Sequence, residues 1–144
     1  MFRVLVIDDE PNIRFSIEQV FEGTDVLVRS AGNSIEGLQL ASVERPDVVL
    51  LDLKLADRSG LEVFDELRQR DPKCLVVFIT GHGTAETAIE AMKRGAYDYL
   101  LKPLDAPHLQ QIVTQACEIS RLMHVPTLVD DSDRPEESPD RLIG

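Results

Sequence analysis

The hydrophobic positions of this chain gather into five short apolar runs, at residues 2–7, 25–29, 48–51, 75–80 and 97–101. The first, third and fourth runs are nearly continuous, which is typical of parallel β-strands covered on both faces. A segment with the hydrophobic spacing of an amphipathic helix follows each run. Because crossovers between parallel strands are right-handed, five such units predict a parallel sheet with helices on both faces. The expected fold class is therefore α/β, in three layers.

Residues that favour helix ends occur at the borders of the helical segments. Proline fits the first turn of a helix, Ser, Thr and Asp cap its N-terminus, and glycine often ends it. Ser59 and Glu62 also have the S-x-x-E spacing of a capping box. These signals predict helices that begin near Pro11, Ser34, Ser59, Thr84 and Asp105; the first stops before Gly23, the third near Asp71-Pro72, the fourth at Gly95 and the fifth near Met123.

The composition changes after residue 123. Residues 124–144 contain three prolines, six acidic residues and two arginines. Such a segment buries too little apolar surface to offset the entropy of ordering it. We therefore expect one domain at 1–123, followed by an acidic, proline-containing tail or linker at 124–144.

The charge and composition of the chain argue against several classes of function. The formal net charge is −11, which argues against direct binding of nucleic acid because such binding depends on cationic contacts to phosphate. No apolar run has transmembrane length, and the N-terminus does not have the anatomy of a signal peptide. Cys74 and Cys117 lack metal-type spacing, so we expect small buried hydrophobic side chains in a reducing compartment. A cytoplasmic protein without membrane contact is predicted.

Polar residues follow four of the five predicted strands. In parallel α/β sheets the ligand site lies at the carboxyl ends of the strands. Singly, an acidic residue after a strand is usually a helix cap, and a Thr or Lys there is usually structural. Their expected convergence in one crevice is what points to chemistry. The residues concerned are Asp8, Asp9 and Glu10 after the first strand, Asp52 after the third, Thr80 after the fourth and Lys102 after the fifth.

These side chains together permit phosphoryl transfer. Clustered carboxylates favour a hard cation such as Mg²⁺ (or Mn²⁺), which binds oxygen ligands and waters. A carboxylate beside that cation can attack a phosphoryl group and form an acyl phosphate. Asp52 is the expected nucleophile because the third strand is central in such sheets, with Asp8 and Asp9 on its neighbour. Lys102 can neutralise charge, and the Thr80 hydroxyl can donate to a phosphoryl oxygen.

Four motifs in this order resemble the receiver domains of bacterial two-component response regulators. They are VLVIDDEP at the start, DVVLLDLKLADRSGLEV around Asp52, VVFITGHG around Thr80 and GAYDYLLKPLD around Lys102. The resemblance covers roughly the first 120 residues. It implies a flavodoxin-like (βα)5 sheet with strand order 2-1-3-4-5. It also implies a regulatory domain that catalyses its own phosphorylation and dephosphorylation, and is not an enzyme with an external substrate.

The resemblance assigns roles to individual residues. Asp52 matches the phosphoacceptor, Asp9 the direct metal ligand and Asp8 a partner that binds through water. The position of Lys54 contributes its backbone carbonyl to the metal. A cis bond before Pro103 is expected, and His82, like Lys54, occupies a position that can tune loss of the phosphoryl group. Thr80 and Tyr99 match the switch pair, and Lys102 matches the lysine that contacts phosphate.

A finer resemblance concerns the stretch GHGTAETAIEAMKRGAYDYLLKP, which is similar to the receivers of NtrC-like activators of sigma-54 RNA polymerase. It implies a sensor histidine kinase as phosphoryl donor and a homodimer through the fourth helix, fifth strand and fifth helix. It further implies an output domain in the same chain, because RLIG at 141–144 is similar to the start of an AAA+ domain.

Three other classes compete with this interpretation. An aspartyl hydrolase of the haloacid-dehalogenase type usually has a second Asp two residues after its nucleophile, where this chain has Lys54. A nucleotide- or flavin-binding module needs a phosphate loop after the first strand, but residues 8–11 would repel phosphate without metal. A degenerate receiver that acts only as a dimerisation module is the third, and the full set of Asp8, Asp9, Asp52, Thr80 and Lys102 argues against it. Within the receiver class, a stand-alone phosphorelay shuttle stays open.

Overall fold

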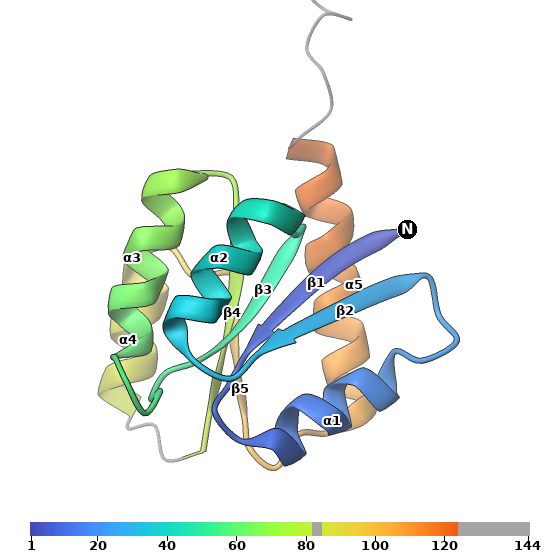
Figure 1. The fold of residues 1–144 in the computed structure, drawn as a ribbon, viewed down its shortest axis with the longest axis horizontal. Coiled ribbons are helices and arrows are strands. Elements are labelled where there is room, and N and C mark those ends of the chain that lie inside the picture. Colours follow the sequence, from blue (N-terminus) through green and yellow to red (C-terminus); the bar gives the residue numbers. More distant parts are fainter. Residues whose placement is uncertain (82–84, 124–144) are drawn as a thin grey trace, which may run out of the picture.

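Strands and helices alternate along the whole of the described chain. The computed structural model describes residues 1–81 and 85–123, and Figure 1 shows their arrangement. The elements are β1 (Phe2–Ile7), α1 (Pro11–Val20), β2 (Val26–Ala31), α2 (Ser34–Glu44), β3 (Val48–Asp52), α3 (Gly60–Arg70), β4 (Leu75–Thr80), α4 (Ala85–Lys93), β5 (Asp98–Leu101) and α5 (Ala106–Met123).

The five strands form one parallel sheet in the order β2-β1-β3-β4-β5. The predicted flavodoxin-like topology and the central place of β3 are thereby confirmed. Ile7 pairs with Leu51 across β1 and β3, and Asp52 pairs with Ile79 across β3 and β4. Strand order reverses at β1, since β2 lies on one side of it and β3 on the other. The carboxyl ends of β1 and β3 therefore flank the crevice in which sheets of this kind bind ligands.

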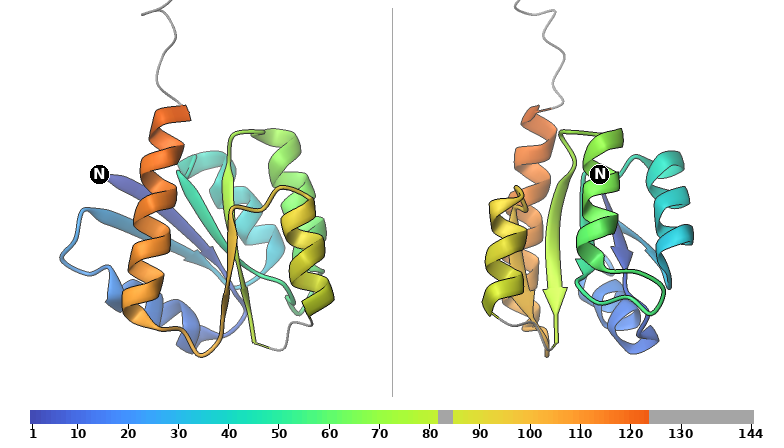
Figure 2. Two further views of the ribbon diagram at one scale, coloured as in Figure 1. Left: turned by 180° about the vertical axis from the view of Figure 1, so that it is seen from behind. Right: turned by 90° about the vertical axis from the view of Figure 1, so that its left-hand side faces the viewer.

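Helices cover both faces of the sheet (Figure 2). The strand side chains alternate between two apolar layers, one on each face. On one face Leu5, Leu51 and Phe78 pack against residues of α2 and α3, including Phe64, whose ring centroid lies 5.4 Å from that of Phe78. On the other face β1, β3 and β4 pack against α1 and α5. All five residues of β3 are buried, which explains why that run is almost entirely apolar. The two apolar layers therefore cover both faces of the sheet.

Most of the predicted helix ends are confirmed. Pro11 begins α1, the Ser59 hydroxyl caps α3 by accepting from the amide of Leu61, and Asp105 Oδ2 accepts from the amide of His108 at the start of α5. Gly95, just after α4, has φ +107°, a conformation that glycine adopts without steric cost.

Two details of the helix ends are wrong in the sequence-based prediction. The cap of α2 is Asn33, which accepts from the amide of Glu36, whereas Ser34 is the first helical residue. Ser34 instead donates its hydroxyl to Asp57. At α3 the capping box is only half formed, because Glu62 pairs with Arg58.

Strand boundaries differ from the apolar runs by one or two residues: β2 spans 26–31 and β5 spans 98–101. Cys74 and Cys117 are buried and unpaired, as expected. The predictions for His82, Thr84 and the tail at 124–144 fall outside the described residues. Within the described ranges, no helix is both long and apolar enough to cross a membrane.

Candidate functional site

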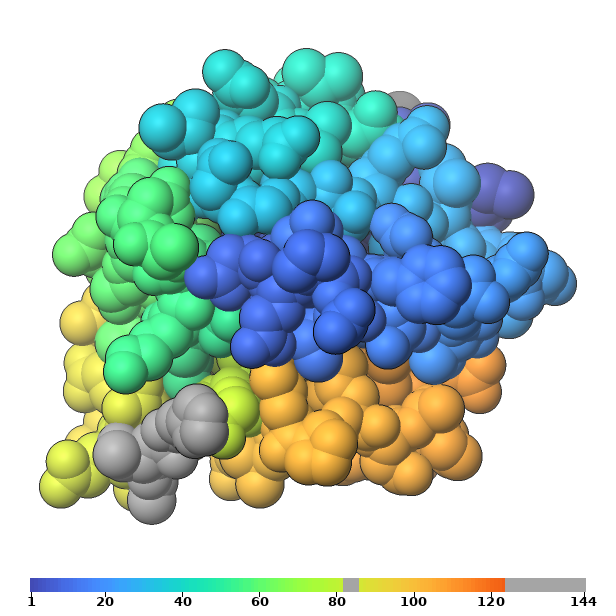
Figure 3. Space-filling model, turned by 60° about the horizontal axis from the view of Figure 1, so that its bottom comes forward, coloured from blue at the N-terminus to red at the C-terminus, as the bar shows by residue number. Residues whose placement is uncertain are grey.

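The segments that follow β1, β3 and β5 meet at one end of the molecule. Figure 3 views this end: residues of the β1–α1 region (blue) lie between those of the β3–α3 region (green) and the start of α5 (orange). Parallel pairing produces the meeting, because it aligns the carboxyl ends of the strands at one edge. The predicted convergence of residues far apart in sequence is thus present.

Three aspartates form a compact cluster at this end. Asp8 and Asp9 follow β1, and Asp52 is the last residue of β3. One carboxylate oxygen from each lies within 4.8 Å of the others, and Asp8 and Asp52 are buried. Close, buried carboxylates repel one another and lose hydration, so the cluster requires positive charge.

Lys102 supplies part of that charge. Its Nζ lies 3.0 Å from Asp8 Oδ2, 3.0 Å from Glu10 Oε1 and 3.3 Å from Asp52 Oδ2. Burial alone lowers the pKa of Lys102, but the three carboxylates outweigh it and hold this pKa above its usual value. The lysine is therefore a permanent cation in the crevice. The peptide bond between Lys102 and Pro103 is cis, as expected.

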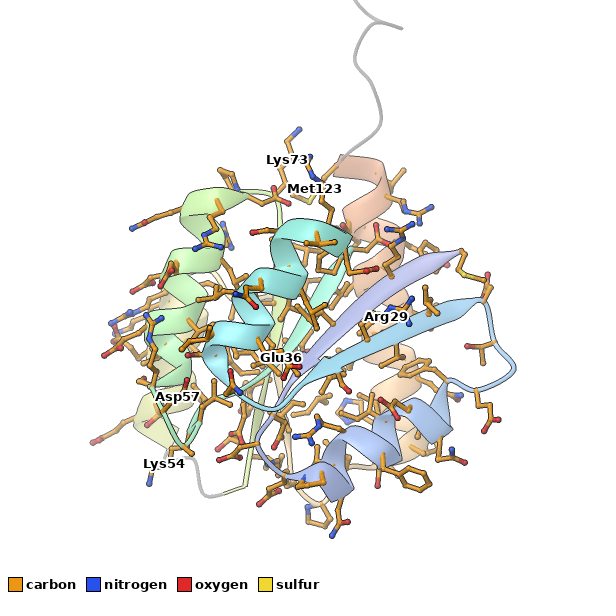
Figure 4. The ribbon with its side chains drawn as sticks, in the orientation of Figure 1. Arg29, Glu36, Lys54, Asp57, Lys73 and Met123 are labelled. Atoms are coloured by element: carbon orange, nitrogen blue, oxygen red, sulfur yellow. The ribbon has the colours of Figure 1, made fainter. Side chains whose placement is uncertain are left out.

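Each oxygen of Asp52 has its own partner. Oδ1 accepts from the backbone amide of Lys54 at 3.1 Å, and Oδ2 faces Lys102. Burial raises the pKa of Asp52, with Asp8 adding to the effect, while the Lys54 amide and Lys102 act in the opposite direction. The side chain of Lys54 is exposed and projects outward (Figure 4), so only its backbone faces the cluster.

The cluster fits a hard divalent cation. Asp8 Oδ2 is buried and accepts no hydrogen bond of good geometry from the described residues, although Lys102 Nζ lies 3.0 Å away. A buried oxygen of this kind normally has a partner. A donor set of three carboxylates, all of them oxygen ligands, suits Mg²⁺ or Mn²⁺ and not the softer transition metals.

Thr80 and Tyr99 lie on the adjacent strands β4 and β5, but in different environments. Thr80 follows Ile79, which pairs with Asp52. Thr80 is buried at the end of β4, while Tyr99 on β5 is 39% exposed. Tyr99 lines a surface groove of about 440 Å³ together with Ala88, Ile89 and Met92 of α4. The structure thus brings Thr80 to the site and leaves Tyr99 beside an apolar groove.

Gly60, the first residue of α3, packs directly against the backbone of Asp52 and Leu53. A Cβ atom there would lie 2.2 Å from the carbonyl oxygen of Asp52 and 2.8 Å from Leu53 Cα. The Gly60 amide donates to the Leu53 carbonyl at 2.9 Å. No other residue fits without movement of the backbone that carries Asp52.

Sequence reasoning missed three contributors. Glu10 belongs to the acidic run after β1, and its contact with Lys102 is not predicted by that run. Arg14, on the first turn of α1, donates to the carbonyl of Asp8 at 2.6 Å. Asp57, in the loop after β3, binds the first residue of α2. The Glu10–Lys102 and Asp57–Ser34 contacts join segments far apart in the sequence, so no local pattern signals them, whereas Arg14 lies only six residues from Asp8.

Comparison with known proteins assigns the family. Residues 4–114 match the response regulator receiver domain. Curated relatives include the response regulator protein PilR of Pseudomonas aeruginosa (38% identical over 117 residues) and the nitrogen assimilation regulatory protein NtrX of Azorhizobium caulinodans (37% over 121 residues). These alignments cover 81% and 83% of this chain, but only 26% and 27% of the relatives.

Solved structures agree with the family match. The signal receiver domain of a putative LuxO repressor from Vibrio parahaemolyticus aligns with a TM-score of 0.81 and 28% identity, over 90% of this chain and 97% of that one. NtrX from Brucella abortus, in complex with ATP, aligns with a TM-score of 0.79 and 35% identity, over 85% of this chain and 28% of that one.

The fold and site define a receiver domain, and the chain belongs to the response-regulator receiver family of two-component signalling. Its relatives PilR and NtrX are of the NtrC-like type that the sequence resembles. Membership decides against the aspartyl hydrolase and the nucleotide-binding module. The chain spans about a quarter of the length of the curated relatives it matches.

Proposed function

We propose that this chain is the phosphoacceptor domain of a response regulator, in which Asp52 takes a phosphoryl group from a sensor histidine kinase. The observation that carries the proposal is the cluster itself, since Asp8, Asp9 and Asp52 share one crevice with Lys102. A carboxylate and an ammonium group in that arrangement serve as nucleophile and charge-neutralising group for phosphoryl transfer.

In the proposed reaction one Asp52 oxygen forms a bond to phosphorus while the bond from phosphorus to the donor imidazole nitrogen breaks. The imidazole leaves with the electron pair, and Asp52 becomes an acyl phosphate. Asp8, Asp9, Asp52 and the backbone carbonyl of Lys54 would hold Mg²⁺ or Mn²⁺, which supplies charge neutralisation at the transferring oxygens. The hydroxyl of Thr80 donates to a phosphoryl oxygen, and Lys102 pairs with the added charge.

Phosphorylation adds about 1.5 to 2 negative charges at the end of β3. We infer that Thr80 moves toward this charge and that Tyr99 turns inward from the groove it lines, changing the surface of α4, β5 and α5. Ile89, Met92 and Leu101 are exposed on these elements, which supports their use as an association surface. The proposed readout is a homodimer through this face.

The further context is proposed on the resemblance to NtrC-like activators. Residues 1–123 form the receiver, and residues 124–144 lead to an output domain that acts with sigma-54 RNA polymerase in the cytoplasm. Met123, at the end of α5, lies at the opposite end of the molecule from Lys54 and Asp57 (Figure 4). The Met123 carbonyl accepts from Lys73 Nζ at 3.1 Å. Helix α5 therefore ends away from the proposed phosphorylation site.

The first test is intact mass after incubation with acetyl phosphate, with and without Mg²⁺. We expect one added phosphoryl group that requires Mg²⁺ and is absent from Asp52→Ala. Asp65→Asn serves as control, since Asp65 is an exposed carboxylate on α3 paired with Arg94. If no variant gains mass and beryllofluoride also fails to bind, the domain is a degenerate interaction module and the proposal is wrong.

A second test addresses the switch. Tyr99→Ala should leave the rate of phosphorylation unchanged and weaken phosphorylation-dependent association, measured by sedimentation velocity with and without beryllofluoride. Association as strong as in the wild type would show that Tyr99 has no role in the readout.

A further inference from the structure

Asp57 connects the loop after β3 to the N-terminus of α2. Its Oδ2 accepts from the Ser34 hydroxyl at 2.6 Å and from the Ser34 amide at 3.2 Å, and its Oδ1 lies 3.4 Å from that amide. Ser34 is fully buried, whereas Asp57 is otherwise open to solvent. Figure 4 shows Asp57 in the β3–α3 loop beside the start of α2.

The contact is favourable for both partners. The first amides of a helix have no partner within the helix, and the helix dipole favours a negative charge beside them. The Ser34 hydroxyl lowers the pKa of Asp57 below its usual value. The nearby side chains of Asn33 and Glu36 bind other amides: Asn33 accepts from the Glu36 amide, and Glu36 accepts from the Gly32 amide. Asp57 thus supplies the acceptor for two buried donors of Ser34.

The loop held by this contact is short and closed. The Leu55 amide donates to the Arg58 carbonyl at 3.2 Å, and the Gly60 amide donates to the Leu53 carbonyl at 2.9 Å. Three residues before Asp57, the Lys54 amide donates to Asp52 Oδ1. Asp57 lies at the tip of this closed loop and Lys54 at its base, so the contact with α2 is three residues from the amide that binds Asp52.

We propose that Asp57 is a positioning residue for the phosphorylation site. Through the loop it holds the Lys54 amide on Asp52 Oδ1, which orients the nucleophile. This inference rests on the proposed function and adds α2 to the elements that shape the site. Conversely, movement of α2 changes the orientation of Asp52.

The experiment compares Asp57→Ala, Asp57→Asn and Ser34→Ala in the full chain. Amide hydrogen exchange at Lys54, followed by NMR without metal, reports the loop directly. We expect exchange about tenfold faster in Asp57→Ala. The Mg²⁺ dissociation constant from calorimetry should rise about tenfold, as for other residues that orient ligands, with slower phosphorylation by acetyl phosphate. Asp57→Asn keeps an acceptor and Ser34→Ala keeps the amide donor, so both should have smaller effects.

Arg58→Ala is the matched control. Arg58 is the next loop residue, but it pairs with Glu62 and Glu66 on α3 and does not touch α2. Equal Lys54 exchange in Asp57→Ala and Arg58→Ala overturns the proposal. So does faster exchange with an unchanged Mg²⁺ dissociation constant and phosphorylation rate, since Asp57 then only supports the fold. If the wild type binds no Mg²⁺ and gains no phosphoryl group, the proposed function itself fails. Should Asp57→Ala not fold, the two milder variants still decide the question.

Discussion

Gly60→Ala is the perturbation whose outcome the packing at the site predicts most directly. The added Cβ would sit 2.2 Å from the Asp52 carbonyl oxygen and 2.8 Å from Leu53 Cα. Both neighbours are backbone atoms, so no side chain can rotate away. The start of α3 must then separate from the end of β3, and the hydrogen bond from the Gly60 amide to the Leu53 carbonyl is lost.

Three effects determine how much Gly60→Ala lowers the unfolding free energy. Overpacking costs about 1–3 kcal/mol, and at 2.2 Å the upper end applies. The lost hydrogen bond costs about 1 kcal/mol. The higher helix propensity of alanine stabilises the helix by at most about 1 kcal/mol, which offsets part of these costs. The net loss of unfolding free energy is therefore about 3 kcal/mol, which lowers the thermal midpoint by roughly 10 °C in a domain of this size.

Urea denaturation followed by circular dichroism measures this loss; the chain contains no tryptophan to serve as a fluorescence probe. Gly23→Ala is the comparison, because Gly23 has φ +80° but no atom within 4 Å of the place that a Cβ would occupy. Its cost is backbone strain alone, about 1–2 kcal/mol. A loss below about 1 kcal/mol for Gly60→Ala, or a smaller loss than for Gly23→Ala, would refute the steric argument.

Two further predictions concern the two buried cysteines and Arg121 on α5. Burial raises the pKa of both the Cys74 and Cys117 thiols to about 12, against 9.0 for a free thiol. As the pH rises, the thiols of the unfolded chain therefore lose their protons before those of the folded chain. The stability that the buried thiols contribute should be fully present below pH 9 and should fall as the pH rises toward 12. Urea midpoints between about pH 8 and 11 should fall more steeply in the wild type than in the double Cys→Ala variant, and parallel slopes would contradict this. Arg121→Ala removes an ion pair with Asp47, a hydrogen bond to the Met1 carbonyl and a cation–π contact with Phe2. Because the guanidinium is half exposed, we expect the unfolding free energy to fall by about 1 kcal/mol. A urea midpoint equal to that of the wild type would show that these contacts contribute nothing to stability.

The sequence alone determined the strands, the sheet and the meeting of Asp8, Asp52 and Lys102. The reason is that apolar periodicity reports burial, and burial on both faces of short strands leaves a parallel sheet with right-handed crossovers. Once that sheet forms, its carboxyl ends must coincide. Residues separated by 50 and 94 positions in the sequence could therefore be placed together from the pattern of the chain.

Only the tertiary structure determined which partner each polar side chain contacts. Ser34 has the chemistry of a helix cap, but Asn33 takes that place and Ser34 binds Asp57, 23 residues away. Likewise Lys102 contacts Glu10 as well as the two buried aspartates. Several partners of similar chemistry compete for such a side chain, and differences of a few ångströms select among them. Those distances arise only when separate elements pack, so no local pattern in the sequence contains them.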